Sequence, residues 1–265
     1  MSIRCIDAHI HVDLYKEERR DSLLEEAKRS GVEGVVAISM NLASSRATAD
    51  LAKRHGHYIM PAYGYHPEQP IPSKEEEEQL FHWINERYES GEIFAIGEVG
   101  LPYYTRTEAE AAGKGFDEQP YIQLLERFIK LAAQWDRPIV LHAVYEDAGI
   151  ACELLEKHSV KRAHFHWFKG DSAVIKRMVK AGYYVSITPD VQYEEEIRRL
   201  VRQYPIQLLM VETDGPWPFE ERYNGRETIP AMASDAALCI AELKGLPAEQ
   251  TATVLLANTK RFYGI

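Results

Sequence analysis

Residues 3–13 of this 265-residue chain read IRCIDAHIHVD, a short apolar run that ends in two histidines separated by one residue. Seven similar runs follow along the chain. They are nearly continuous in their hydrophobicity and do not alternate, which is typical of parallel strands covered on both faces. We therefore predict eight strands, at residues 3–7, 34–40, 58–64, 93–98, 138–142, 161–166, 183–187 and 207–212.

The stretches between these runs carry the spacing of amphipathic helices. In residues 74–90, Leu80, Phe81 and Ile84 recur on one helical face, and Ser73 with Glu76 forms a candidate capping box. Glycines that suit the left-handed end of a helix stand before four of the predicted strands, at Gly31, Gly56, Gly91 and Gly182.

Strict alternation of eight strands with helices predicts an α/β fold, a single (β/α)8 TIM barrel, in preference to an open doubly wound sheet. No Pro/Ser/Gly-rich linker divides the sequence, so we expect one domain over residues 1–265. The longest stretch without clear periodicity is 102–118, directly after the fourth predicted strand.

The charge balance limits the function classes. With 31 Lys+Arg against 41 Asp+Glu, the net charge is −10, which disfavours an extended nucleic-acid surface or adhesion to an anionic membrane. No apolar run is long enough for a membrane span, and no secretory signal is expected. The three separated cysteines favour a reducing compartment, so we predict a cytoplasmic protein.

Side chains that can bind metal ions recur where the predicted strands end, which is where barrel enzymes place their active sites. His9 and His11 point the same way from an extended segment, so they can share one ion. Six ligands are too many for one tetrahedral site with an open position, and they suit two ions that share a carboxylate. The candidates are His9 and His11, Glu98, His142, one or both of the histidines His164 and His166 at the end of the sixth strand, and Asp214 after the eighth.

Seven sequence blocks together resemble the TatD family of metal-dependent hydrolases, within the amidohydrolase superfamily. They are IDAHIHVD, GYHP, IGEVGLPYY, PIVLHA, HFHWFKG, ETDGPW and NTKRFYG, in the family's order and almost from end to end of the chain. The resemblance implies a (β/α)8 barrel and a two-metal phosphoesterase, often a deoxyribonuclease.

Carried over position by position, the resemblance assigns a role to each candidate ligand. It implies that one metal is held by His9, His11, Glu98 and Asp214. Glu98 bridges to a second metal, which His142 and His166 hold. The histidine of the GYHP block, His66, is implied to lie near the substrate, on a phosphate oxygen.

The chain departs from the family pattern at two places, both on the substrate side. Pro102 stands where the family usually has Asp, and Ala143 and Val144 stand where it often has Ser-Arg. The planar fork of an arginine suits phosphate, so its loss leaves the substrate open. The metal ligands are unaffected.

Other residues on the predicted strand-end loops are candidates for substrate contact. Tyr103, Trp167, Lys169 and Arg226 are our choices, with Tyr104, Phe168, Trp217 and Arg222 beside them. The aromatic residues either stack a base or sugar or pack the loops onto the barrel. His164, two residues before His166, is either a seventh ligand or, as we expect, a hydrogen-bonded interior residue. Asp7 either holds an imidazole or caps the strand.

We predict a metal-dependent hydrolase that activates water with two divalent ions, zinc, manganese, magnesium or nickel, to cleave a phosphodiester. The partner is a small-molecule phosphoester or a nucleic-acid end, such as the 3′ end of DNA. Asp214 orients the water and takes its proton, and Glu98 spaces the ions. One alternative is an amidohydrolase or lactonase acting on a small C–N or C–O substrate. Another is a non-catalytic, metal-stabilised binding module.

Overall fold

The computed structural model describes residues 3–265, so Met1 and Ser2 of the predicted domain lie outside the described residues. Eight parallel strands lie in one sheet in chain order. Their bounds are β1 Cys5–Ile10, β2 Val32–Ile38, β3 Ile59–Tyr63, β4 Ala95–Gly100, β5 Ile139–His142, β6 Ala163–Phe165, β7 Tyr184–Ile187 and β8 Leu209–Val211. All eight overlap the strands predicted from the sequence.

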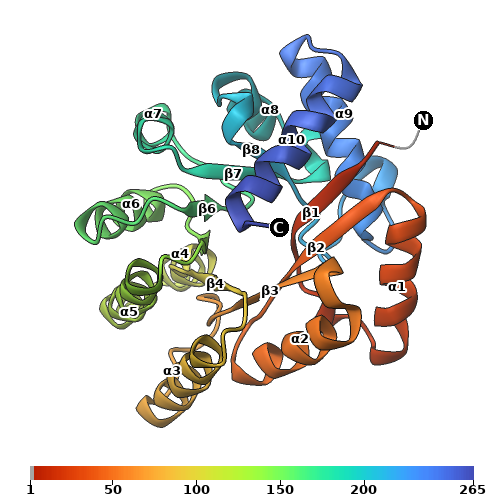
Figure 1. Ribbon diagram of the computed structural model, residues 1–265. Coiled ribbons are helices and arrows are strands. Elements are labelled where there is room, and N and C mark those ends of the chain that lie inside the picture. The colour runs from red at the N-terminus through yellow and green to blue at the C-terminus, as the bar shows by residue number, and fades with distance from the viewer. Residues whose placement is uncertain (1–2) are drawn as a thin grey trace.

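Helices follow the strands and surround the sheet, as Figure 1 shows. The α-helices are α1 Glu17–Arg29, α2 Leu42–His55, α3 Lys74–Glu89, α4 Tyr103–Ala111, α5 Gln119–Trp135, α6 Asp147–Lys157, α7 Ser172–Ala181, α8 Glu195–Gln203, α9 Ala233–Lys244 and α10 Ala248–Tyr263. Short 3-10 helices are η1 Val12–Leu14, η2 Gly56–Tyr58, η3 Pro189–Gln192, η4 Ile206–Leu208, η5 Glu221–Tyr223 and η6 Pro230–Met232. This arrangement is the (β/α)8 barrel expected from the sequence.

Local signals in the sequence explain where several helices begin and end. The capping box predicted at the start of α3 is present, because Ser73 accepts from the Glu76 amide and Glu76 accepts from the Ser73 amide. The four glycines that we predicted as helix ends all have positive φ, for example +78° at Gly182, where α7 ends. Glycine adopts this conformation without a side-chain clash.

Hydrogen bonds near the carboxyl ends of the strands join β1 and the residue after it to the segment that follows β8. The amide of Asp214 donates to the His9 carbonyl at 2.9 Å, and the amide of His11 donates to the Gly215 carbonyl at 2.8 Å. The Asp7 carboxylate accepts from the amide and hydroxyl of Thr213, at 2.9 and 2.5 Å. Asp7 therefore closes the seam between β1 and the segment after β8, and among the described residues its hydrogen-bond partners are backbone amides and the Thr213 hydroxyl.

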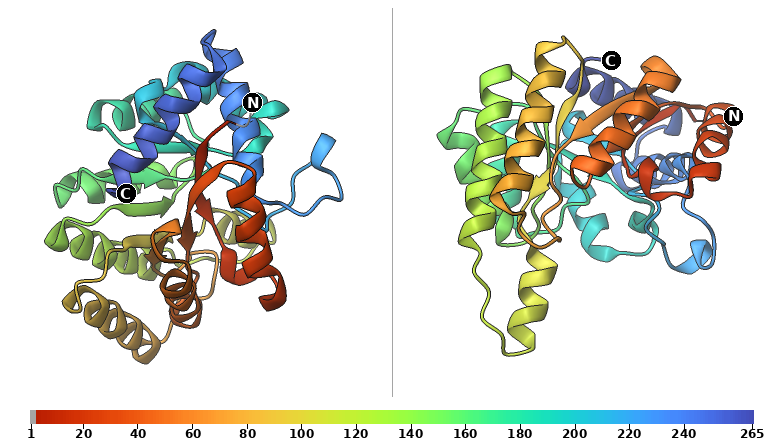
Figure 2. Two further views of the ribbon diagram at one scale, coloured as in Figure 1. Left: turned by 45° about the vertical axis from the view of Figure 1, so that its right-hand side comes forward. Right: turned by 90° about the horizontal axis from the view of Figure 1, so that it is seen from below.

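Helix α4 lies in the stretch that lacked clear periodicity in the sequence. None of its residues is buried, so the sequence carries no apolar stripe there to reveal a helix. In Figure 2, α4 and the loop that carries η5 both project from the body, and in the right-hand view they project toward the same side. These two excursions follow β4 and β8, so they rise from the carboxyl-terminal rim.

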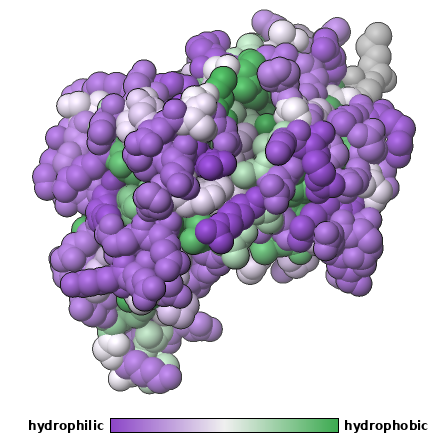
Figure 3. Space-filling model, turned by 60° about the horizontal axis from the view of Figure 1, so that its bottom comes forward, coloured by the Kyte–Doolittle hydropathy of each residue, from purple (hydrophilic) through white to green (hydrophobic). Residues whose placement is uncertain are grey.

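The surface in Figure 3 is mainly hydrophilic, and its hydrophobic residues lie in small separate patches. Within residues 3–265, no helix is long and apolar enough to cross a membrane. The three cysteines are buried and free.

Candidate metal centre

The six predicted ligands converge at the carboxyl-terminal rim of the barrel. His9 lies in β1, Glu98 in β4 and His142 at the end of β5, while His166 and Asp214 follow β6 and β8. Glycine makes this convergence possible, because a Cβ at Gly100 would lie 1.8 Å from the His142 carbonyl oxygen. The bare backbone of Gly100 lets β4 and β5 approach closely.

Four of these side chains form a first group. The Nε2 atoms of His9 and His11 lie 3.4 Å apart. Glu98 Oε2 lies 3.2 and 3.5 Å from them, and Asp214 Oδ1 lies 3.3 and 3.4 Å from them. Two ligands about 2.1 Å from one ion at a tetrahedral angle are about 3.4 Å apart, so this spacing fits a divalent ion.

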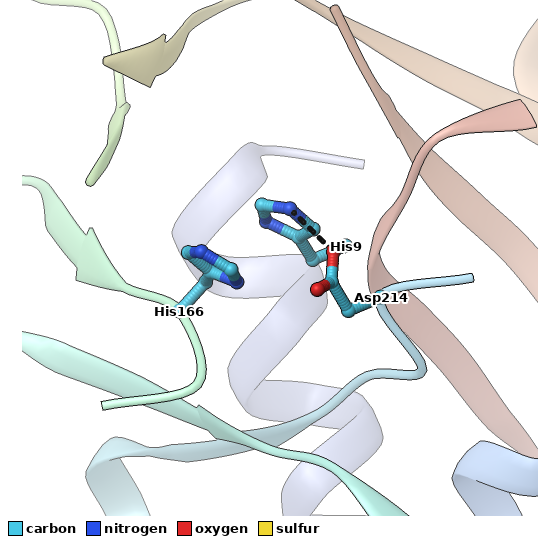
Figure 4. Close-up of side chains that lie close together, drawn as sticks. All are labelled: His9, His166 and Asp214. Atoms are coloured by element: carbon cyan, nitrogen blue, oxygen red, sulfur yellow. Dashed lines mark ion pairs between the residues drawn. The ribbon is translucent and has the colours of Figure 1, made fainter. Parts of the chain in front are cut away.

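The other oxygen of Glu98 belongs to a second group. Glu98 Oε1 lies 3.0 Å from His142 Nδ1 and 2.6 Å from His166 Nε2, and these two nitrogens are 3.2 Å apart. Glu98 therefore offers one carboxylate oxygen to each pair of histidines. Figure 4 shows His9, His166 and Asp214 together, and the His9 and His166 rings stack with centroids 3.8 Å apart.

The donor atoms of the cluster fit metal ions. Within residues 3–265, Glu98 Oε2 and Asp214 Oδ1 are buried and accept no hydrogen bond. Buried carboxylate oxygens without a partner are unfavourable, and a divalent cation would satisfy both. Burial alone would raise the pKa of Glu98, but His166 and the other charged imidazoles hold it well below its ordinary value. The carboxylate is therefore available as an anionic ligand.

His66 lies beside the cluster but offers a different atom. The amide of Glu68 donates to His66 Nδ1 at 3.1 Å, and burial lowers the pKa of His66 to about 3. The ring is therefore neutral, with its proton on Nε2, which lies 3.5 Å from Glu98 Oε2. His66 thus presents an N–H group to the site, which suits a substrate oxygen better than a metal ion.

A further carboxylate, to which the sequence assigned no role, supports the second group of ligands. Glu212, fully buried, lies 3.7 Å from His166 Nδ1. It accepts from the Trp167 amide at 2.8 Å and from the Ser186 hydroxyl. Ser186 in turn contacts His164 Nε2, so His164 is an interior hydrogen-bonded residue, as expected. In the sequence, the position of Glu212 at the end of a predicted strand was the signal that could have identified it as a site residue.

The residues predicted to contact substrate lie at different places around the cluster of candidate metal ligands. The Tyr103 ring packs on Tyr145, with centroids 4.7 Å apart. Tyr104 lies closer, with its ring centroid 6.0 Å from that of His142. Arg226 lies in the loop after β8, between η5 and η6, where it is exposed. The role of each of these residues stays a prediction.

Trp167 and Lys169 lie together after β6. Trp167 Nε1 donates to Asp190 Oδ2 at 2.6 Å, which fixes the indole, and the Lys169 ammonium lies 5.8 Å from its ring centroid. Lys169 has no ion pair within residues 3–265. Arg222, by contrast, pairs with Asp235 at 2.6 Å.

A (β/α)8 barrel with buried histidines and carboxylates at its carboxyl-terminal rim defines the class of metal-dependent barrel hydrolases. The chain belongs to the TatD related DNase family, whose model matches residues 6–264. It is therefore a metal-dependent hydrolase of the TatD type, as the sequence blocks predicted.

Individual relatives are similar to this chain over nearly the full length of both chains. The chain is 40% identical to an uncharacterized metal-dependent hydrolase of Haemophilus influenzae, over 97% of this chain and 98% of the relative. It is 29% identical to the human deoxyribonuclease TATDN3, over 97% and 94%. The crystal structure of the Escherichia coli TatD homologue YjjV matches the fold with a TM-score of 0.83 at 24% identity, and covers 100% of both chains.

Proposed function

We propose that this protein uses two divalent metal ions to hydrolyse phosphodiesters, with a small phosphoester or the 3′ end of DNA as substrate. The observation that carries the proposal is that the two carboxylate oxygens of Glu98 face different histidine pairs. Oε2 faces His9 and His11, and Oε1 faces His142 and His166. One carboxylate between two histidine pairs is the arrangement that two neighbouring ions require.

Bound ions would lower the pKa of a water molecule and neutralise charge on the attacked phosphate oxygens. The protein's own residues supply orientation and proton transfer. The side chain of Asp214 is 12% exposed, the most of the six, so it is best placed to orient the attacking water and accept its proton. Glu98 is fully buried and holds the two ligand groups at a fixed separation.

The phosphate would be held by neutral and cationic donors at the rim. His66 directs its Nε2–H at the cluster and can donate to a phosphate oxygen. Lys169 is the cation best suited to replace the missing arginine, because its ammonium is unpaired within residues 3–265 and lies beside Trp167, next to His166. The net charge of −10 favours a small or end-bound substrate over a long duplex.

A small C–N or C–O substrate is the second candidate function. Ala143 and Val144 stand in the place of the Ser-Arg pair and are buried, so this loop offers no cation to a phosphate. Amides and lactones do not need one. The complete set of six ligands argues against a purely non-catalytic binding module.

The test combines elemental analysis with two substrate panels. We expect Glu98→Ala and His142→Ala to lose bound metal and to lose hydrolysis of bis(p-nitrophenyl) phosphate and of 3′-labelled DNA oligonucleotides. His82→Ala is the matched control, because His82 is 76% exposed on α3. Turnover of amides or lactones without phosphodiester turnover would favour the second candidate. Unchanged metal and unchanged rates in both variants would refute the site.

A further inference from the structure

The loop after β3 carries a carboxylate that the proposed function does not use. Glu68 Oε1 lies 3.2 Å from His142 Nε2, the ring nitrogen that faces away from Glu98. We propose that Glu68 is a positioning residue, which holds His142 so that Nδ1 is presented to the second metal ion. This inference rests on the proposed metal centre and concerns the strength of one of its two sites.

The two nitrogens of His142 have separate partners. Nδ1 lies 3.0 Å from Glu98 Oε1 and 3.2 Å from His166 Nε2, inside the cluster. An ionised Glu68 can only accept a hydrogen bond, so it keeps the imidazole proton on Nε2. The lone pair then stays on Nδ1, and the hydrogen bond fixes the ring orientation and raises its basicity as a ligand.

His142 depends on such a partner more than the other three histidine ligands. Its side chain is 10% exposed, against 0%, 7% and 5% for His9, His11 and His166, so packing holds it least. In the part of the chain that the structure describes, the outer nitrogens of His9 and His11 have no hydrogen-bond partner, and Glu212 lies 3.7 Å from that of His166. Among these four histidines in the described part of the chain, only His142 has a carboxylate at hydrogen-bond distance from its outer ring nitrogen.

Glu68 is itself held rigidly by the first turn of α4. Its Oε1 accepts from the Tyr104 amide at 2.9 Å, and its Oε2 accepts from the amide and hydroxyl of Thr105, at 2.7 and 2.5 Å. The residue at the N-cap position of α4 is Pro102, whose side chain accepts no hydrogen bond. Glu68 therefore supplies the missing cap from another loop, in a position where an anion is favoured.

These contacts separate two roles that one residue could combine. If Glu68 only caps α4, then any loss of the cap should have the same effect as loss of Glu68. If Glu68 positions His142, then the affinity of the second metal site should depend on Glu68 alone. Thr105→Val tests the cap in part, because it removes one of the three cap contacts, the hydroxyl contact to Oε2, and leaves both amide contacts and the acceptor of His142 intact.

The experiment titrates metal-free protein with Co²⁺ and Zn²⁺ against a competing chelator, and follows the visible absorption of bound Co²⁺. Glu68→Ala should weaken binding of the second ion, the one that His142 and His166 would hold, by about 10- to 100-fold and leave binding of the first ion unchanged. Thr105→Val should bind both ions as the unaltered protein does. Glu68→Gln keeps an acceptor for His142 Nε2, so it should bind the second ion more tightly than Glu68→Ala.

His142→Ala serves as the reference variant, and circular dichroism verifies that each variant is folded. If His142→Ala loses one ion while Glu68→Ala binds both normally, the role of Glu68 is refuted and the metal centre stands. The role is also refuted if Thr105→Val weakens the site as much as Glu68→Ala. If His142→Ala keeps both ions, the proposed metal centre itself is wrong.

Discussion

Asp7 offers a stability test at the seam of the barrel, because it joins β1 to the segment that carries Asp214. Asp7 is fully buried and accepts from the amide and hydroxyl of Thr213, which is also fully buried. A longer contact of 3.3 Å comes from the His9 amide. Replacing Asp7 with alanine removes the acceptor and leaves two Thr213 donors buried without a partner.

The size of the effect follows from those two donors. Each unsatisfied buried donor destabilises a fold by about 1–3 kcal/mol, so Asp7→Ala should lose about 2–6 kcal/mol. The unfolding entropy of a 265-residue chain is about 0.56 kcal/mol/K near 60 °C, so Tm should fall by about 4–11 °C. Because β1 carries His9 and His11, metal affinity of the first group should fall as well.

Thermal unfolding of chelator-treated protein, followed by circular dichroism, measures the effect without a contribution from bound metal. Burial raises the pKa of Asp7 well above its ordinary value, against the opposing hydrogen bonds of Thr213 and His9. A neutral asparagine should therefore be less damaging than alanine, because its amide oxygen accepts from the Thr213 amide. A Tm for Asp7→Ala equal to that of the unaltered protein would refute the reasoning, as would Asp7→Asn being equally damaging.

Three further predictions concern metal, protonation and helix capping. Removing an ion present at about 1,000 times its Kd should lower stability by about 4 kcal/mol, and therefore Tm by about 7 °C, in differential scanning calorimetry; an unchanged Tm contradicts this. Burial, opposed by hydrogen bonds from Thr188 and Trp167, raises the pKa of Asp190 from 3.8 to about 6, so the native carboxyl keeps a proton that the unfolded chain releases. Its contribution to stability is present below pH 3.8 and is lost as pH rises through 6. The Trp167 indole N–H signal in ¹⁵N NMR should shift with a midpoint near pH 6, and no such shift should occur in Asp190→Asn. Ser73→Ala should destabilise the protein by about 1 kcal/mol in urea denaturation because it breaks the capping box, whereas exposed Ser22→Ala on α1 should change little.

The fold could be predicted because each buried strand is also an apolar run in the sequence. The residues at which the strands begin and end were harder to predict from the sequence. The first strand was predicted at 3–7 and lies at Cys5–Ile10, because His9 is fully buried inside the barrel although it is polar. Helix α4 was missed for the opposite reason, since it has no buried residue and so no apolar stripe.

The candidate ligands could be predicted because barrel topology brings strand ends together, whatever lies between them in the chain. Their supporting residues could not. Glu68 stands in a loop, and its contact with His142 depends on where the first turn of α4 lies. Likewise, Tyr103 and Tyr104 are adjacent in sequence, and only the helical turn decides which ring faces His142.

The two departures from the family pattern are packed together in space. Tyr103, which follows Pro102, packs against Tyr145, which follows Val144. Arg106 of α4 donates to Glu146 and Asp147 at 2.9 and 2.7 Å, so α4 is fastened to the loop after β5. The two departures therefore lie in segments that contact each other, because α4 packs on the loop after β5. An arginine restored at position 144 alone would be placed where the side chain is now 3% exposed, so burial of an unpaired cation would oppose it. We therefore expect substrate choice to depend on α4 and the loop after β5 together, and we expect that a single exchanged residue would not convert the site to the family's usual pattern.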